Sequence, residues 1–177
     1  MVPRCRNLQA KLIVTDKLCV DLYGDYVRPV FNGSKWKLDI TTTVRNDEYD
    51  DAEVKLIHHI FDSAGNERAL YETVGNVGAR SLCDISFSGT FGNPKLWDID
   101  SPVLYTLFTE VVSGGGIRDT YKTKFGFRTF KFDCEKGFIL NGRQVKLKGV
   151  CSHQDYGLTG KAVPDNVYRY RVEMIKE

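Results

Sequence analysis

His153 and Asp155 are the two side chains in this sequence whose types and position best suit ligand binding. They lie in the loop Cys151–Val163, which directly follows the short apolar segment Val145–Val150. An imidazole can donate to or accept from a hydroxyl group, and a carboxylate accepts from paired hydroxyls. Polar loop residues also commonly do no more than face water, so the pair alone leaves both interpretations open.

The other candidates for chemistry favour structural roles. His58 and His59 are adjacent in a predicted strand and point to opposite faces, which argues against a metal site and predicts one packed and one solvated ring. Gly114–Gly116 joins two predicted strands with no helix after it, unlike a phosphate-binding loop. Trp36 and Trp97 could form a carbohydrate-stacking platform, but aromatic residues of a sandwich more often fill its core.

The five cysteines are an odd number, so at least one thiol has no partner within the chain. No two of them have metal-ligand spacing, and the chain is too long to depend on a disulfide scaffold. We therefore expect buried free thiols and no metal site. The cysteines are Cys5, Cys19, Cys83, Cys134 and Cys151.

The composition argues against two classes of partner. The net charge is +2 and the basic residues are scattered, so no electrostatic footprint for nucleic acid is present. No apolar run is long enough for a membrane helix, and the N-terminal residues lack the apolar core of a signal peptide. We expect no nucleic-acid or membrane partner, and the sequence does not indicate a cellular compartment.

The sequence from Leu8 to about Arg128 predicts an all-β domain. Apolar residues alternate with polar ones, and turn signals separate the runs. The predicted runs include Trp36–Val44, Val54–Ile60, Glu67–Val74, Ser81–Ser88, Leu104–Val112 and Ile117–Phe125. About seven short strands fit a two-sheet sandwich of immunoglobulin type. The strands that would carry the antibody-type cysteine pair contain none, so we expect a sandwich core without cysteine.

The character of the sequence changes after Phe127. A turn at Glu135–Gly137 and the pair Asn141-Gly142 predict a β-hairpin, because Asn-Gly suits the two positive-φ positions of a type I′ turn. Val145–Val150 then predicts a further strand, and Pro164–Glu177 predicts the start of a helix.

The predicted helix carries an apolar stripe at Tyr168, Val172 and Ile175, and no residue that would end it follows. A strand, a loop and an amphipathic helix make one βα unit, which cannot bury its own apolar faces. The sequence therefore predicts an orphan βα unit that needs partners from a larger protein.

Several motifs in this order resemble glycoside hydrolase family 2, the family of β-galactosidases, β-glucuronidases and β-mannosidases. The resemblance extends from Leu8 to the helix and is strongest after Leu96. The matching motifs are LIVTDKLCVDLYGDYV at Leu12–Val27, LWDIDSPVLYTL at Leu96–Leu107, FGFR at Phe125–Arg128, GFILNGRQVKLKGV at Gly137–Val150, SHQD at Ser152–Asp155, and EMIKE at the end of the helix.

This resemblance implies an N-terminal sugar-binding domain before the chain and a (β/α)₈ barrel after it. Residues 1–10 would be a leader from the preceding domain, and residues 11–128 the immunoglobulin-like β-sandwich. Residues 129–177 would be the hairpin and the start of the truncated barrel. Arg128 is expected to join sandwich and barrel through a fork of hydrogen bonds.

The chemistry that the resemblance implies is hydrolysis of a β-glycosidic bond with retention, by two glutamates that lie on later barrel strands. Neither glutamate is in this chain, so no catalytic residue is assigned here and no cofactor is expected. His153 and Asp155 match the family positions that contact the sugar at the end of the first barrel strand. Cys151 and Gln154 depart from the Asn and Glu that the family usually has at those positions.

The resemblance thus implies an internal structural domain of a retaining, β-galactosidase-like β-glycosidase that is inactive alone. Its partners would be the rest of the parent polypeptide and, in the intact enzyme, a β-glycoside substrate. The alternative is a stand-alone immunoglobulin-like module for carbohydrate binding or adhesion. The uncapped βα tail favours the enzyme domain.

Overall fold

The computed structural model describes residues 12–153, 156–157, 160 and 163–176. They form two compact units. The first unit is Thr15–Lys146. The second takes in the described residues of Leu147–Glu177 together with the segment before Thr15.

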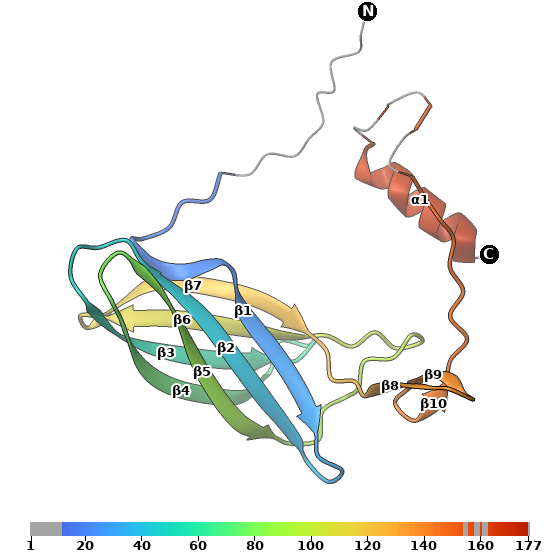
Figure 1. Cartoon of the computed structure of the whole chain (residues 1–177), viewed down its shortest axis with the longest axis horizontal. Coiled ribbons are helices and arrows are strands. Elements are labelled where there is room, and N and C mark those ends of the chain that lie inside the picture. The colour runs from blue at the N-terminus through green and yellow to red at the C-terminus, as the bar shows by residue number, and fades with distance from the viewer. Residues whose placement is uncertain (1–11, 154–155, 158–159, 161–162, 177) are drawn as a thin grey trace, which may run out of the picture. The chain divides into compact units, whose positions relative to one another are not determined.

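Seven antiparallel strands form the two sheets of a sandwich in the first unit (Figure 1). One sheet has three strands in the order β1-β2-β5, and the other has four in the order β4-β3-β6-β7. The strands are β1 (Leu18–Phe31), β2 (Trp36–Asn46), β3 (Ala52–Phe61), β4 (Glu67–Val77), β5 (Ser81–Phe91), β6 (Tyr105–Ser113) and β7 (Gly116–Phe125). The predicted immunoglobulin-like sandwich is confirmed, and six of its strands overlap the runs predicted from the alternation.

The position of β4 differs from the constant-type immunoglobulin arrangement, in which the fourth strand joins the sheet of the first, second and fifth. Here β4 pairs with β3, from Ala52 opposite Val77 to Phe61 opposite Glu67. The turn between them explains this pairing. The Asp62 carboxylate accepts hydrogen bonds from the backbone N–H groups of Ala64 and Asn66, at 2.9 and 3.0 Å. This closed local turn keeps β4 beside β3.

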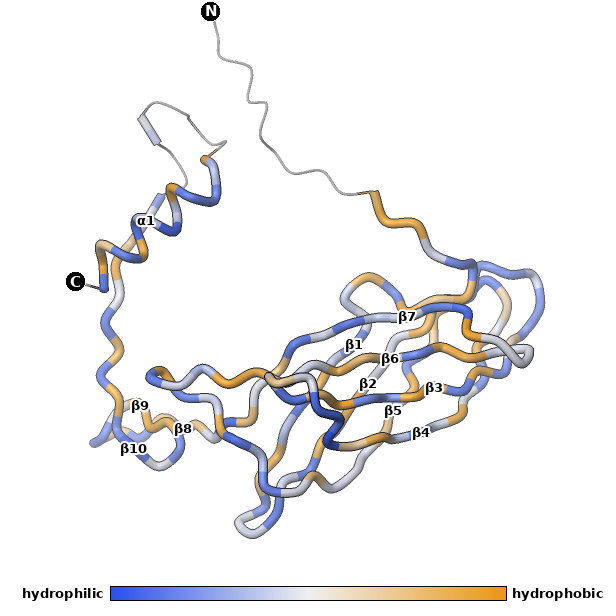
Figure 2. Tube along the Cα trace, turned by 180° about the vertical axis from the view of Figure 1, so that it is seen from behind, coloured by the Kyte–Doolittle hydropathy of each residue, from blue (hydrophilic) through white to orange (hydrophobic). Residues whose placement is uncertain are grey.

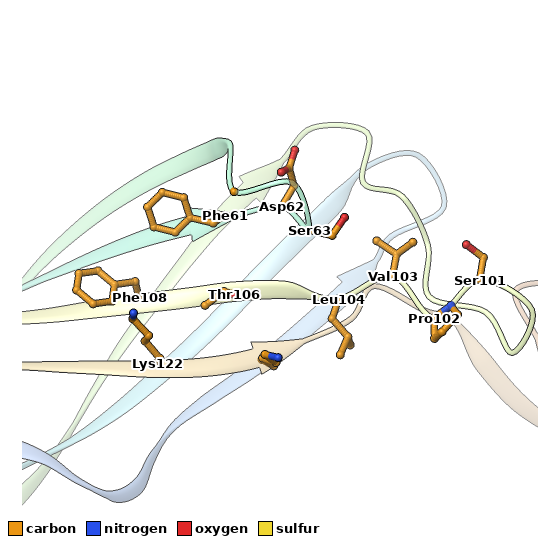
Figure 3. Close-up of a pocket in the computed structure, with 12 residues that line it drawn as sticks. Phe61, Asp62, Ser63, Ser101, Pro102, Val103, Leu104, Thr106, Phe108 and Lys122 are labelled. Atoms are coloured by element: carbon orange, nitrogen blue, oxygen red, sulfur yellow. The ribbon is translucent and has the colours of Figure 1, made fainter. Parts of the chain in front are cut away.

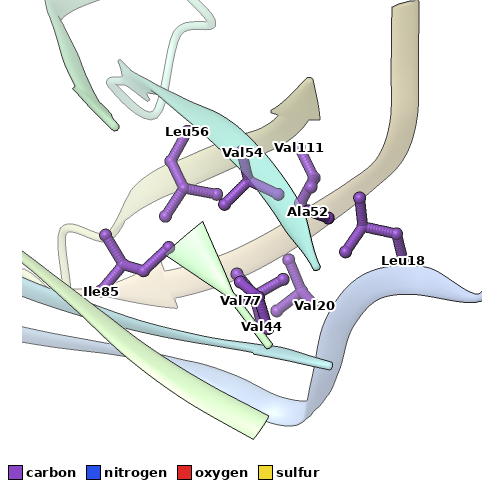
Figure 4. Close-up of a cluster of buried hydrophobic side chains, with 9 residues drawn as sticks. All are labelled: Leu18, Val20, Val44, Ala52, Val54, Leu56, Val77, Ile85 and Val111. Atoms are coloured by element: carbon purple, nitrogen blue, oxygen red, sulfur yellow. The ribbon is translucent and has the colours of Figure 1, made fainter. Parts of the chain in front are cut away.

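Hydrophobic and hydrophilic residues alternate along the strands (Figure 2), and this alternation places apolar side chains between the sheets and polar ones outside. Two clusters fill the interior. The first gathers aliphatic side chains (Figure 4): Leu18, Val20, Val44, Ala52, Val54, Leu56, Val77, Ile85 and Val111. The second is largely aromatic: Trp36, Leu38, Ile40, Ile60, Phe91, Tyr105, Leu107, Phe125 and Phe127. Trp36 therefore belongs to the core and not to an external platform.

The prediction of a core without cysteine is wrong. Cys19 lies on β1 and is fully buried, although its neighbours Leu18 and Val20 take the inward positions of the first cluster. It lies opposite Arg45 of β2, whose guanidinium donates to the Cys19 Sγ at 3.4 Å. Cys83 is half-buried against the first cluster, whereas Cys134 and Cys151 are exposed. The expected burial of free thiols therefore holds fully for Cys19 alone among the described cysteines, all of which are free. Cys5 lies outside the described residues.

A bulge interrupts β1 between Val20 and Asp25. These two residues would face opposite sides of a regular strand, yet both are buried, because the extra residues reverse the alternation. Tyr23 in the bulge has φ of 59°. A Cβ atom on Gly24 would lie 2.8 Å from the backbone oxygens of both Asp21 and Thr43, so the bulge requires glycine there.

The predicted hairpin is present as the small sheet of β8 (Phe130–Asp133), β9 (Gly137–Leu140) and β10 (Arg143–Gln144). Asn141 and Gly142 form its second turn with φ of 49° and 82°, as Asn-Gly predicts. Within the first unit, the Asn141 side chain also connects the hairpin to the segments at Thr129 and Trp97. Its Oδ1 accepts from the Thr129 N–H at 3.0 Å, and its Nδ2 donates to the Trp97 carbonyl at 2.9 Å.

The predicted strand at Val145–Val150 is wrong. Residues 145–150 form no strand, although the Val145 N–H still donates to the Phe138 carbonyl at 2.9 Å. Leu147 and Val150 are 65% and 68% exposed. A parallel strand exists only beside other strands that accept and donate its backbone hydrogen bonds, and the described residues offer none here.

Helix α1 (Asp165–Lys176) forms where the sequence predicts a helix. Its apolar stripe is open, because Tyr168, Val172 and Ile175 are 38%, 53% and 61% exposed. None of its described residues is buried.

Candidate functional site

The loop before α1 is held at two points by Arg171 of that helix. The Arg171 guanidinium donates to the Ser152 hydroxyl at 3.3 Å and lies over the Tyr156 ring, 4.6 Å from its centroid. Tyr156 and Gly160 exchange backbone hydrogen bonds of 3.1 and 2.8 Å, which closes a turn in which Gly160 has φ of 60°. One arginine thus fixes the residue before His153 and an aromatic residue shortly after it.

His153 is exposed on this anchored loop. Its imidazole makes no hydrogen bond or ion pair with any described residue, so both ring nitrogens are available to a ligand hydroxyl. Asp155, the second predicted sugar-contacting residue, lies outside the described residues. Sequence reasoning missed Arg171 and Tyr156. Arg171 lies off the apolar stripe of the helix, which is the position of an ordinary solvated cation.

A polar layer separates the two core clusters of the sandwich. It consists of one inward position on each of four strands: Asp25 on β1, Thr42 on β2, His58 on β3 and Thr109 on β6. Both threonine hydroxyls donate to the Asp25 carboxylate at 2.7 Å, Thr42 to Oδ1 and Thr109 to Oδ2. His58 Nδ1 lies 3.2 Å from the Thr109 hydroxyl, and its Nε2 is buried with no partner among the described residues.

Burial controls the charge of this layer. Burial raises the pKa of the Asp25 carboxyl, against the two threonine hydrogen bonds that lower it and with a smaller rise from Asp119. Burial, aided by the neighbouring His59 ring, lowers the pKa of His58 from its ordinary 6.5 to about 4. Because Thr109 donates to Asp25, its oxygen is left to accept, so the neutral His58 ring carries its proton on Nδ1. His58 is packed and His59 partly solvated, as predicted.

An open groove of about 960 Å³ lies on the outer face of the four-stranded sheet (Figure 3). Phe61, Thr106 and Phe108 line the sheet side. Ser63 and Ser101 come from the two loops at the rim, and two cations complete the lining. The cations are Lys122 and Lys124 of β7. Sequence reasoning did not find this groove, because it depends on which strands lie side by side.

A second, smaller groove of about 500 Å³ shares Leu104 and Lys124 with the first. It is lined by Tyr26, Val27, Arg28, Pro29, Trp97, Leu104, Lys124, Phe125, Gly126, Arg128 and Phe130, and thus by no carboxylate. The Arg128 guanidinium stacks on two rings, 5.1 Å from the Trp97 centroid and 5.6 Å from that of Phe130. The expected fork of hydrogen bonds from Arg128 is not formed with any described residue.

A metal-binding cluster and a membrane-spanning helix are both absent from the described part of the chain. No cluster of three or more His, Cys, Asp or Glu side chains is arranged to hold a metal ion. No helix among the described residues is long and apolar enough to cross a membrane.

Comparisons with known proteins agree on one family. The sequence profile of glycosyl hydrolases family 2 matches residues 24–128. A β-galactosidase of Bacteroides ovatus is 38% identical over 140 residues, which are 79% of this chain and 16% of that protein. A β-galactosidase of Thermoanaerobacter pseudethanolicus is 28% identical over 171 residues, 97% of this chain and 22% of that protein.

Solved structures show the same fold. A family 2 glycosyl hydrolase of Bacteroides cellulosilyticus superposes with a TM-score of 0.82 at 28% identity, covering 92% of this chain and 21% of that one. A β-glucuronidase of Bacteroides uniformis gives a TM-score of 0.82 at 26% identity, covering 92% of this chain and 20% of that one. The chain therefore spans about a fifth of the length of these relatives. With its profile match over most of the sandwich, it belongs to family 2 of the glycosyl hydrolases.

Proposed function

We propose that this chain is an internal structural segment of a retaining, β-galactosidase-like β-glycosidase, and that it is inactive alone. The observation that carries the proposal is that the match takes in 79% of this chain but only 16% of the Bacteroides ovatus β-galactosidase. The family profile matches residues 24–128, most of the sandwich, and such a segment suits a structural role between larger domains.

The proposed division of the chain follows from this role. Residues 1–10 are a leader from a preceding sugar-binding domain, and residues 11–128 are the sandwich. Residues 129–177 are the hairpin and the first residues of a (β/α)₈ barrel. The exposed residues 146–150 and the open stripe of α1 support the last assignment, because the other strands and helices of a barrel would cover them.

The proposed reaction needs two carboxylates about 5–5.5 Å apart, one as acid/base and one as nucleophile. We place both on later parts of the parent polypeptide. This chain would contribute the loop that follows residues 145–150, where His153 and Asp155 would bind sugar hydroxyls. Arg171 supports this role because it holds the loop through Ser152 and Tyr156.

The second candidate is a stand-alone immunoglobulin-like module that binds carbohydrate. The aromatic groove of the four-stranded sheet favours it. The two candidates differ in the full-length gene product, because only the enzyme segment requires a polypeptide that continues into a barrel.

The loop assignment is tested by His153→Gln in the full-length parent polypeptide. We expect kcat/KM for a chromogenic β-galactoside to fall by about tenfold to a hundredfold, since one or two hydrogen bonds to the sugar are lost. Lys37→Gln is the control, because it also introduces a glutamine, at an exposed position of the three-stranded sheet outside both grooves, and should leave kcat/KM unchanged. An unchanged kcat/KM in His153→Gln would contradict the sugar-binding role.

A further inference from the structure

The groove on the four-stranded sheet, lined by Phe61, Thr106, Phe108, Lys122 and Lys124, is built by strand register. Phe61 of β3 lies opposite Thr106 of β6, which lies opposite Lys124 of β7. One row further along, Phe108 of β6 lies opposite Lys122 of β7. These rows share the outer face, because the intervening residues of β6 point into the core. The rings of Phe61 and Phe108 form the floor of the groove, and this floor therefore lies directly beside the two cations.

The floor is held in place by stacked rings. The His59 ring lies 6.1 Å from the Phe61 ring in a stacked arrangement and 6.1 Å from the Phe108 ring. Lys122 Nζ lies over the Phe108 ring, 5.4 Å from its centroid. Both phenylalanines are only half-buried, so they present ring surface to the groove (Figure 3). Flat, half-exposed rings of this kind suit the apolar C–H face of a sugar ring.

The charge of the groove favours an anion. Lys122 and Lys124 are exposed, and no carboxylate forms an ion pair with either of them in the described part of the chain. Asp62 is the one acidic lining residue, and its carboxylate is already engaged by Ala64 and Asn66 of its own turn. Nearby Glu110 points to His59 Nε2 at 4.0 Å and does not line the groove.

The rim supplies neutral hydrogen-bonding groups. Ser63 and Ser101 come from two different loops and line the groove, and these exposed residues carry hydroxyls that can donate to or accept from a ligand hydroxyl. Positive charge also continues past Lys124 into the second groove, where Arg128 lies. A ligand with several rings and repeated acidic groups therefore matches both the shape and the charge of this face.

We propose that this groove binds an acidic saccharide, with sugar rings on Phe61 and Phe108 and carboxylates held by Lys122 and Lys124. That the acid is carried by a saccharide rests on the proposed function. The attraction for an anion follows from the groove alone. The site lies on the sandwich and is independent of the loop that carries His153.

The proposal is tested by calorimetric titration of the 177-residue chain with a trisaccharide of galacturonic acid and with its neutral galactose counterpart. We expect the acidic trisaccharide to bind at least about tenfold more tightly than the neutral one. The double variant Lys122→Gln/Lys124→Gln should lose this preference, and Phe108→Leu should weaken binding of the acidic sugar. Because both lysines are exposed, the double variant should remain folded.

The matched control is Lys55→Gln/Lys37→Gln, which removes the same charge from outside the groove. Lys55 pairs with Glu72 at 2.9 Å on the same sheet, and Lys37 pairs with Asp39 at 3.1 Å on the other sheet. If this control variant lost as much affinity for the acidic trisaccharide as the groove variant, the loss would follow from net charge alone, and the proposal would be overturned.

Three other outcomes would also overturn it: no binding of the acidic sugar, equal binding of the neutral sugar, or equally tight binding of an oligoglutamate peptide of the same charge. The last would assign the face to an acidic protein segment. None of these titrations depends on hydrolysis, so a failure here leaves the proposed enzyme role standing.

Discussion

Replacing Phe127 by alanine should lower the free energy of unfolding of the sandwich by about 3–5 kcal/mol. Phe127 is fully buried, and its ring lies 4.7–5.4 Å from the rings of Phe91, Tyr105, Trp36 and Phe125. Truncation removes these contacts and leaves a cavity that the surrounding rings cannot fill by small movements. Urea denaturation followed by circular dichroism measures the change.

Phe132→Ala is the matched control, because it deletes the same side chain from the hairpin, where it is 73% exposed. We expect its free energy of unfolding to change by about 0.5 kcal/mol or less. A similar loss in both variants would mean that Phe127 is not the centre of the aromatic cluster.

The second large effect is a dependence of stability on pH through His58. The pKa of this ring is about 4 in the folded protein and 6.5 when exposed, so between these values the unfolded chain binds a proton that the folded chain does not. Stability therefore falls as the pH falls from 6.5 through 4. The contribution of His58 to this loss is about 3 kcal/mol, the free energy that corresponds to the difference in pKa.

Urea denaturation at several pH values between 7 and 4 tests this expectation with His58→Gln. Between pH 7 and pH 4 the free energy of unfolding of the variant should fall by about 3 kcal/mol less than that of the original chain, whatever the stability of the variant at pH 7. Asp25→Asn should act in the opposite direction. The folded carboxyl has a raised pKa, so it adds stability as the pH falls, and its removal should make the acid loss steeper. An acid loss in His58→Gln equal to that of the original chain would contradict the burial of a neutral ring.

Much of the sandwich could be predicted because alternation and core packing agree in it. Thr42 and His58 occupy inward positions of otherwise apolar runs, and the alternation placed both inside. Asn141-Gly142 likewise predicted its turn, because few other residues adopt positive φ at both positions. Where the local pattern and burial favour the same conformation, the sequence is sufficient to predict that conformation.

The features that were missed depend on contacts between distant residues. The β1 bulge turns Asp25 inward, against the alternation that a regular strand would have. The outer groove requires Phe61 and Lys124 to meet across β6, which only the sheet order determines. The strand predicted at Val145–Val150 needs partner strands to form.

The candidate site could be predicted less well than the fold. The resemblance located His153, but the anchoring of its loop by Arg171 comes from a helix contact that no pattern in the sequence indicates. Arg128 stacks on Trp97 and Phe130 where a fork of hydrogen bonds was expected, because the rings lie within reach and no described carboxylate pairs with it.

The most direct measurement compares the 177-residue chain with its full-length parent polypeptide on chromogenic β-galactoside and β-glucuronide. We expect no release of chromophore above buffer from the chain, and hydrolysis of at least one substrate by the parent. The chain would then be a supporting segment whose two catalytic carboxylates lie elsewhere. Turnover by the chain itself, or a parent gene that encodes no barrel beyond Glu177, would contradict this account.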